Sequence, residues 1–234
     1  MSNWSSHRFY NIAKNTFRDN QLKILDLLDG RSADRLLDIG CSDGSFTIEC
    51  GRRVNSRKIY GVEISELEVA KAKEKGVDVF LGDASNSFPF ADKYFDVIIA
   101  NQVLEHIYNV DNMLREVRRC LKQNGIFVLS VPNLCSIMQR LLILWGNQPT
   151  VLNVSSEIQV GNFLSGVGLG ANDQHIHAFA PPALKGLVKY YGFRIVKTAG
   201  VGFYPFGTRL SAILSKLDKN CSVYQIIVAA KGDI

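Results

Sequence analysis

Short apolar segments that alternate with helical segments are the feature that most constrains the fold of this chain. Continuous Val, Ile and Leu runs separated by helices are typical of a parallel sheet covered on both faces. The sequence therefore predicts an α/β, doubly wound, mostly parallel sheet. Strands are expected at residues 35–39, 58–62, 77–81, 95–100, 126–131, 193–198 and 224–230, and helices at 45–53, 65–75, 110–121, 181–191 and 208–217.

Composition limits the class of protein further. The 234 residues suit a single domain, 1–234, with an N-terminal helical segment over 1–34. A net charge of +5 is compatible with anionic substrates and falls well short of a nucleic-acid-binding arm. The five cysteines lack C-x-x-C spacing and are expected to be reduced thiols. Since the first residues contain no apolar leader-like run, a cytoplasmic location is expected.

Residues 133–174 interrupt the alternation and are expected to form an insertion after the fifth strand. A connection of this length in a compact domain is typical of a lid or substrate cap. Its apolar start, 134–145, has two interpretations. We favour a helix buried against the insertion's own core; the alternative is an apolar substrate cap or a weak membrane-surface contact for a lipid-linked acceptor. The insertion ends in the glycine-rich stretch 161–170.

A glycine turn after the first strand marks the expected ligand site. In a doubly wound sheet, ligands bind at the carboxyl ends of the strands, where Gly40 and Gly44 lie. Glycine at these positions permits an unusual bend and a close approach of ligand to backbone. Glu63 ends the next strand and can accept hydrogen bonds from ribose hydroxyls, and Asp83 follows the third strand, where it can receive an adenine amino group.

The same turn disfavours a dinucleotide. A G-x-G-x-x-G fingerprint that starts at Gly40 would need glycines where Ser42 and Ser45 stand. Asp38, just before the turn, also fits poorly beside a pyrophosphate. It fits better beside a positively charged group such as an amino acid ammonium.

Taken together, these motifs resemble class I S-adenosylmethionine-dependent methyltransferases of the small-molecule type. The resemblance covers residues 36–132 and extends more loosely through the last helix and strands. It implies a seven-stranded Rossmann-like sheet whose last strand is antiparallel. The family usually has glycine at the position of Ser42. The motifs that carry the resemblance are Asp38-x-Gly40-x-x-x-Gly44, Glu63, Gly82-Asp83, Phe95-Asp96-Val97-Ile98, Leu104-Glu105-His106 and Leu121-x-x-x-Gly125.

The resemblance also implies roles for individual residues toward S-adenosylmethionine. Asp38 and Gly40 would hold its methionine end, with Cys41 and Gly44 in the same loop. Glu63 would take the ribose hydroxyls while Ile64 packs on the adenine. Asp83 would reach the adenine amino group, with Ala84 beside it. Asn101 and Gln102 would lie near the sulfonium and methyl group.

Three histidines are candidates for catalysis. Direct transfer from a sulfonium requires mainly alignment, and a general base helps with a hydroxyl or amine acceptor. His106 is a candidate base or a structural residue that holds its loop. His175 and His177 share one side if their segment is extended, as bases or as ordinary loop residues. A metal site from this pair with Asp173 lacks a clear third ligand, so no metal is predicted.

Other side chains could complete the site. His7, Trp4 and Tyr10 could close over the cofactor, and Tyr204 belongs to an aromatic patch, 203–206, that is more often packing than ligand binding.

The leading hypothesis is methyl transfer from S-adenosylmethionine to a small molecule, with lipid-linked and glycan-related acceptors included. Alternatives are an RNA or protein methyltransferase, a non-catalytic S-adenosylmethionine-binding protein, and a nicotinamide oxidoreductase. Basic residues cluster at 52–58 and 115–122, but they suit solvated helix ends better than an RNA-binding surface. Nucleic acid is therefore not expected as a partner.

Overall fold

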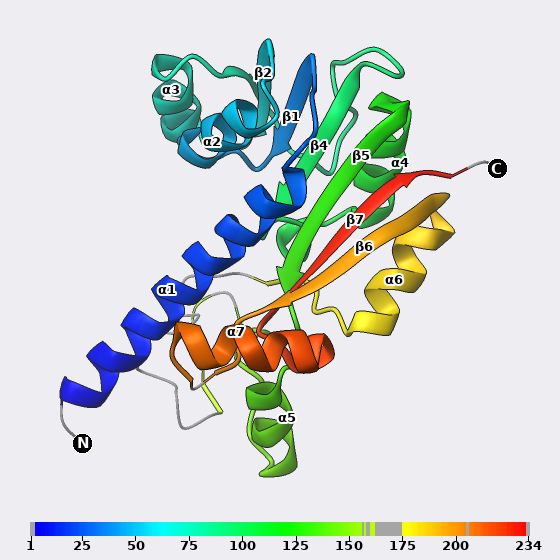
Figure 1. The fold of residues 1–234 in the computed structure, drawn as a ribbon. Coiled ribbons are helices and arrows are strands. Elements are labelled where there is room, and N and C mark those ends of the chain that lie inside the picture. Colours follow the sequence, from blue (N-terminus) through cyan, green and yellow to red (C-terminus); the bar gives the residue numbers. More distant parts are fainter. Residues whose placement is uncertain (1–2, 156, 158–159, 162–174, 205, 233–234) are drawn as a thin grey trace.

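A seven-stranded sheet forms the centre of the molecule (Figure 1). The computed structural model describes residues 3–155, 157, 160–161, 175–204 and 206–232. The strand order is β3-β2-β1-β4-β5-β7-β6, and β7 runs antiparallel to both neighbours. The predicted doubly wound, mostly parallel sheet is therefore confirmed. The strands are β1 (Arg35–Ile39), β2 (Lys58–Glu63), β3 (Asp78–Leu81), β4 (Phe95–Asn101), β5 (Leu121–Pro132), β6 (Phe193–Val201) and β7 (Tyr224–Lys231).

Helices cover both faces of this sheet. The α-helices are α1 (Asn3–Leu28), α2 (Ser45–Arg53), α3 (Glu66–Glu74), α4 (Val110–Cys120), α5 (Ile137–Leu144), α6 (Pro181–Tyr190) and α7 (Thr208–Leu217), with short 3-10 helices η1 (Leu104–His106) and η2 (Lys219–Cys221). Within β4, Val97 and Ile99 pack on the face that carries α1 and α2, whereas Ile98 and Ala100 pack toward α4 and α6. This period of two buries both faces and explains the unbroken apolar runs in the sequence.

The strand boundaries differ from the prediction by three residues or fewer, except at the start of the fifth strand, where the difference is five residues. The sequence places the fifth strand at 126–131, but β5 begins at Leu121. Leu121 pairs with Phe95, and the register shifts before Val97 pairs with Ile126. The irregularity accommodates the polar residues between them, which on their own read as a turn.

The segment after β5 leaves the sheet at a fixed point. The Asn133 side-chain amide donates to the carbonyls of Asn220 and Ser222, both at 2.8 Å, and its carbonyl accepts from the backbone N–H of Cys135. These bonds tie the start of the expected insertion to the segment before β7. The helix that follows, α5, is therefore anchored at its N-terminal side.

The expected burial of α5 is only partly correct. Leu142 is fully buried, but Leu144 and Trp145 are 76% and 64% exposed, and Ile143 is exposed as well. Only one face of the helix, which includes Gln139 and Leu142, is buried, and α5 projects from the lower end of the molecule (Figure 1). Among the described residues, no helix combines the length and hydropathy needed to cross a bilayer. Most of the glycine-rich stretch 161–170 lies outside the described residues.

Candidate active site

A cavity of about 660 Å³ opens at the carboxyl ends of β1, β4 and β5. This volume and position are typical of a ligand site in a doubly wound sheet. Residues of α1, the turn after β1, η1, α5 and the start of β7 form its wall. The described lining residues are Thr16, Phe17, Gln21, Asp38, Gly40, Cys41, Ser42, Asp43, Ser45, Phe46, Asn101, Gln102, Glu105, His106, Pro132, Ser136, Met138, Gln139, Thr150, Val151, His175, Tyr204, Val223 and Tyr224.

Gly40 shapes the turn after β1. Its φ is +71°, in the left-handed region that favours glycine. A Cβ at this position would lie 2.4 Å from the Val103 Cγ2, so a side chain cannot be added without displacing Val103. The Gly40 N–H donates to the Val62 carbonyl at 2.8 Å, which joins the turn to the end of β2.

Ser42 stands where the resemblance implies a glycine, and it has a left-handed φ of +48°. Its backbone N–H donates to the Glu63 carboxylate at 2.9 Å. The turn therefore has the left-handed conformation that glycine would allow without strain, and Glu63 holds it in place.

Gly44 has a packing role in addition to the one that the sequence predicts. A Cβ there would lie 3.0 Å from both the Ala72 Cβ and the Val77 Cγ2, and Gly44 is not among the described lining residues of the cavity. Its φ is +75°. Glycine at this position thus permits close packing between the start of α2 and the α3 region; its role in the approach of a ligand stays a prediction.

Asp38 is a buried acid at the cavity wall. It is 3% exposed, and its carboxylate accepts a hydrogen bond from the Thr47 hydroxyl at 2.7 Å. Burial raises the pKa of Asp38 to about 7; the Thr47 hydrogen bond opposes this shift and the nearby Glu63 charge adds to it. A cationic group bound in the cavity would stabilise the ionised form of Asp38.

Glu63 is already engaged by the backbone around it. Besides Ser42, its carboxylate accepts from the N–H groups of Ile64 and Ser65 at 2.8 and 2.9 Å. A carboxylate has about four acceptor sites. Glu63 thus has room for about one further donor. If both hydroxyls of a ribose donated to Glu63, one of the three backbone hydrogen bonds would have to break.

The remaining residues expected around an adenine follow β2 and β3. Ile64 is 69% exposed, which leaves an apolar surface available to a flat ring. The Asp83 carboxylate accepts from the Ser85 N–H at 2.7 Å, and Ala84 is buried in the core. Like Glu63, these three are not among the described lining residues of the cavity.

Asn101 and Gln102 line the cavity and belong to a network with α1. Asn20 is fully buried; its amide donates to the Asn101 side-chain oxygen at 2.7 Å and its own oxygen accepts from the Ser130 hydroxyl at 3.0 Å. The Gln102 amide donates to the same hydroxyl at 3.0 Å. The sequence analysis did not single out Asn20. Its spacing of four positions from Thr16 places both polar side chains on one face of the helix, and this pattern could have indicated a buried polar contact.

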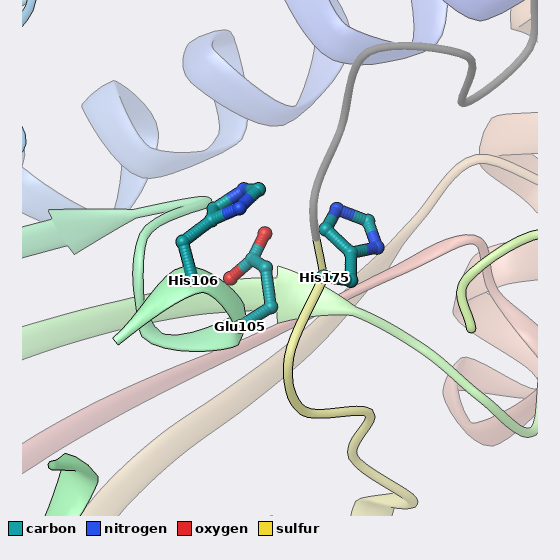
Figure 2. Close-up of side chains that lie close together, drawn as sticks. All are labelled: Glu105, His106 and His175. Atoms are coloured by element: carbon teal, nitrogen blue, oxygen red, sulfur yellow. The ribbon is translucent and has the colours of Figure 1, made fainter. Parts of the chain in front are cut away.

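The histidines are not paired as the sequence suggested. His106 and His175 both line the cavity, and their ring centroids are 4.8 Å apart. His177 is not among the described lining residues; its ring lies 6.2 Å from that of Phe179. Glu105, which is 1% exposed, joins the first two, and Figure 2 shows its carboxylate between the two rings. Sequence reasoning missed Glu105 as a site residue.

Some expected contributors fall outside the described part of the chain. The structure describes the backbone of α1 at Trp4, His7 and Tyr10 but not their side chains, and Asp173 is outside it altogether. Tyr204 lies within the described residues. Unlike Phe206 of the same predicted aromatic patch, which is exposed, Tyr204 is buried and lines the cavity. Burial raises the pKa of Tyr204 to about 12.

The basic residues of α4 are structural rather than simply solvated. The Arg119 guanidinium donates to Glu116 and Asp92 and to the carbonyls of Phe88 and Phe90. Arg118 donates to the carbonyls of Gly192 and Gly232. These side chains hold loops against α4, and the carboxylates of Glu116 and Asp92 offset the charge of Arg119.

Solved structures share this fold over nearly the whole chain. An S-adenosylmethionine-dependent methyltransferase from Thermotoga maritima aligns with a TM-score of 0.62 at 19% sequence identity, covering 96% of this chain and 98% of that one. The fold is therefore the Rossmann-like fold of class I methyltransferases.

Curated relatives match the chain at lower coverage. The 27-O-demethylrifamycin SV methyltransferase of Amycolatopsis mediterranei is 28% identical over 134 residues, which cover 53% of this chain and 49% of the relative. The ubiquinone biosynthesis O-methyltransferase of Pelagibacter ubique is 31% identical over 137 residues, covering 54% and 55%. The chain thus spans about half the length of these relatives.

A family model described as a methyltransferase domain matches residues 12–198. The chain belongs to this methyltransferase family. S-adenosylmethionine is the cofactor that the family and the fold imply. The buried Asp38 fits its ammonium, the left-handed turn at Gly40 fits its methionine portion, and the exposed Ile64 fits its adenine.

Proposed function

We propose that this protein transfers a methyl group from S-adenosylmethionine to a small-molecule acceptor. The observation that carries the proposal is that one cavity is lined by the turn after β1 and also by His106, His175 and α5. When bound, S-adenosylmethionine supplies a methyl group on a sulfonium; the C–S bond breaks as the bond to the acceptor forms, S-adenosylhomocysteine remains, and a hydroxyl or amine acceptor loses one proton.

At the cofactor end, the chain's own groups bind and orient. Asp38 would pair with the ammonium, Gly40 and Cys41 would provide the backbone against which the methionine portion lies, and Glu63 would accept from the ribose. Asn101 and Gln102 would lie near the reacting centre, where the network with Asn20 fixes their orientation. A fixed orientation matters because in-line displacement depends on alignment.

At the other end, the cavity is suited to an acceptor with apolar portions. Met138, Val151 and Tyr204 supply apolar surface. The Gln139 side-chain amide donates to the Thr150 hydroxyl at 2.8 Å while its oxygen accepts the Thr150 N–H at 2.9 Å, so this wall is held together by a two-point contact. His106 and His175 are the groups placed to accept an acceptor proton, and the proposal no longer includes His177.

The names of the two relatives support an oxygen atom of a small molecule as the methyl acceptor, since one is an O-methyltransferase of ubiquinone biosynthesis and the other acts on a demethylated rifamycin. The engagement of Arg118 and Arg119 in loop carbonyls and carboxylates argues against an RNA acceptor.

Calorimetric titration with S-adenosylhomocysteine tests the cofactor part of the proposal. We expect one binding site, and Asp38→Ala should weaken binding by roughly 10- to 100-fold because a charge-assisted contact is lost. Glu74→Ala, an exposed carboxylate on α3, is the matched control and should bind as the wild type does. Equal affinity of the Asp38→Ala variant, or binding of NADH instead, would contradict the assignment.

The exposed end of α5 supports a lipid-linked acceptor. Ile143, Leu144 and Trp145 are exposed next to the exposed Arg140, a combination that suits an anionic lipid surface. In flotation with vesicles that contain anionic lipid, Leu144→Glu should reduce recovery with the lipid, whereas Leu67→Glu, an equally exposed leucine on α3, should not. Equal recovery of both variants would remove the lipid contact from the proposal.

A further inference from the structure

Three potential metal ligands meet at the acceptor end of the cavity. Glu105, His106 and His175 each offer one ligand atom, and all these atoms lie within 4.8 Å of one another. Glu105 and His106 belong to η1 after β4, whereas His175 lies in the segment between α5 and α6, a few residues before α6. Figure 2 shows the three side chains together. All three line the same cavity as Asp38 and Asn101.

Backbone hydrogen bonds hold the two segments together. The Glu105 carbonyl accepts from the N–H groups of Ile176 and His177 at 2.8 and 3.0 Å. The cluster is therefore fixed by the main chain on both sides, so its side chains converge without depending on one another for position.

The surroundings of His175 favour a ligand role for this ring. Its Nδ1 lies 3.3 Å from the Val151 carbonyl oxygen. A carbonyl can only accept, so this contact is a hydrogen bond when Nδ1 carries the proton, and Nε2 is then the ring nitrogen that can serve as a ligand. Metal-binding histidines typically have such a carbonyl or carboxylate behind the ring.

We propose that Glu105, His106 and His175 bind a divalent first-row transition metal ion, which in turn binds an oxygen atom of the methyl acceptor. One carboxylate and two imidazoles suit Zn²⁺ or Mn²⁺, whereas Mg²⁺ and Ca²⁺ prefer oxygen ligands throughout. Three protein ligands leave open coordination positions, as in catalytic metal sites. The inference rests on the proposed function for the identity of the bound oxygen atom.

The present spacing is wider than that of a bound site. Two ligand atoms at about 2.0–2.2 Å from one ion are about 3.4 Å apart in tetrahedral geometry. The cluster, whose ligand atoms lie within 4.8 Å of one another, therefore needs to contract by up to about 1.4 Å, which rotations of the side chains about their χ angles would supply. Glu105 is buried, so a cation here would also balance a carboxylate that has little access to water.

The ion would make the site more selective for the chemical class of its acceptor. A divalent cation lowers the pKa of a bound hydroxyl and orients it. The expected acceptors are thus hydroxyl compounds, in particular those whose second oxygen can occupy another open position. The proton of the metal-bound acceptor hydroxyl leaves to solvent water; Glu105, His106 and His175 stay deprotonated as ligands, so none of them acts as the base while the ion is bound.

Equilibrium dialysis of tag-free protein against ZnCl₂ and MnCl₂, followed by elemental analysis, tests the site. The wild type should bind one equivalent. His175→Ala and the size-conserving Glu105→Gln should each weaken binding more than about 100-fold, the upper range for loss of an outer contact alone. His177→Ala is the matched control, two residues away and outside the cluster, and should stay within about twofold of wild type.

Less than one equivalent bound by the wild type, unchanged binding by a correctly folded His175→Ala or Glu105→Gln, or an equal loss in His177→Ala would overturn the site. Circular dichroism identifies a variant that fails to fold, and His106→Gln then replaces it. S-adenosylhomocysteine is titrated into the same samples. If the protein binds metal but not S-adenosylhomocysteine, only the proposed function is overturned. If it binds S-adenosylhomocysteine but not metal, only the metal site is overturned.

Discussion

The two ends of the cavity are built by different means. At the cofactor end, the turn after β1 and the end of β2 are joined by backbone bonds from Gly40 and Ser42. At the acceptor end, the wall is assembled from side chains that come from η1, from α5 and from His175. The comparison indicates that the first end is specified by local motifs and the second by long-range packing. The predictions below test that difference.

Asp38→Asn should have the largest effect on the cofactor end. Because the folded pKa is raised from 3.8 to about 7, the folded state holds its proton where the unfolded state has lost it. Stability from this group is thus full below about pH 4 and is lost as the pH rises to about 7. Urea unfolding should show Asp38→Asn to be more stable than wild type above pH 7 by a few kcal/mol.

The same substitution should weaken binding of a cationic ligand, so stability and affinity move in opposite directions. In the wild type below about pH 7, binding of the cationic ligand should release a proton from Asp38. The affinity should therefore rise by up to about tenfold for each unit by which the pH is raised toward 7. Calorimetry in buffers of different ionisation enthalpy measures this release. Binding without proton release at pH 6 would show that Asp38 does not face the cationic group.

Gly40→Ala should be the next largest effect. The left-handed φ costs about 1–2 kcal/mol for alanine, and contact with Val103 adds about 1–3 kcal/mol. Denaturant unfolding should report the sum. In a Val103→Ala background, Gly40→Ala should lower the free energy of unfolding by less than in the wild type, because the steric part of the cost is absent and only the cost of the left-handed φ remains. A Gly40→Ala variant of wild-type stability would mean that the turn does not have the left-handed conformation and the contact with Val103 described above.

Asn20→Ala should destabilise the junction between the two ends. It leaves Asn101 and Ser130 without a buried partner, at a cost of about 1–3 kcal/mol. Asn15→Ala, at an exposed position of α1, is the control and should change the free energy of unfolding little. If both variants unfold at the same denaturant concentration, the network does not stabilise the cavity.

Sequence patterns place residues at the cofactor end more directly than at the acceptor end, for a physical reason. Gly40 and Asp83 follow strands and Glu63 ends one, so their position at one sheet edge follows from the parallel direction of the strands. The grouping of Glu105 with His175 depends on how the chain returns after α5, which no local periodicity encodes. Gly44 shows the reverse limit: its motif position was evident, but its contacts with Ala72 and Val77 required the packed structure.

Ser42→Gly should give the smallest effect. It relieves the left-handed strain at φ +48° but adds backbone freedom to the unfolded chain, so the net change should stay within about 1 kcal/mol. The backbone N–H that donates to Glu63 is retained. Affinity for S-adenosylhomocysteine should therefore be unchanged in titration. A large loss of affinity would assign the Ser42 hydroxyl a direct role in binding.

A crystal structure with S-adenosylhomocysteine tests the central claim most directly. The account predicts density for the amino acid portion beside Asp38 and Gly40, the ribose at Glu63 and the adenine against Ile64, with the sulfur directed toward the part of the cavity lined by His106 and His175. Density elsewhere, or an empty cavity at saturating ligand while NADH binds there instead, would contradict it.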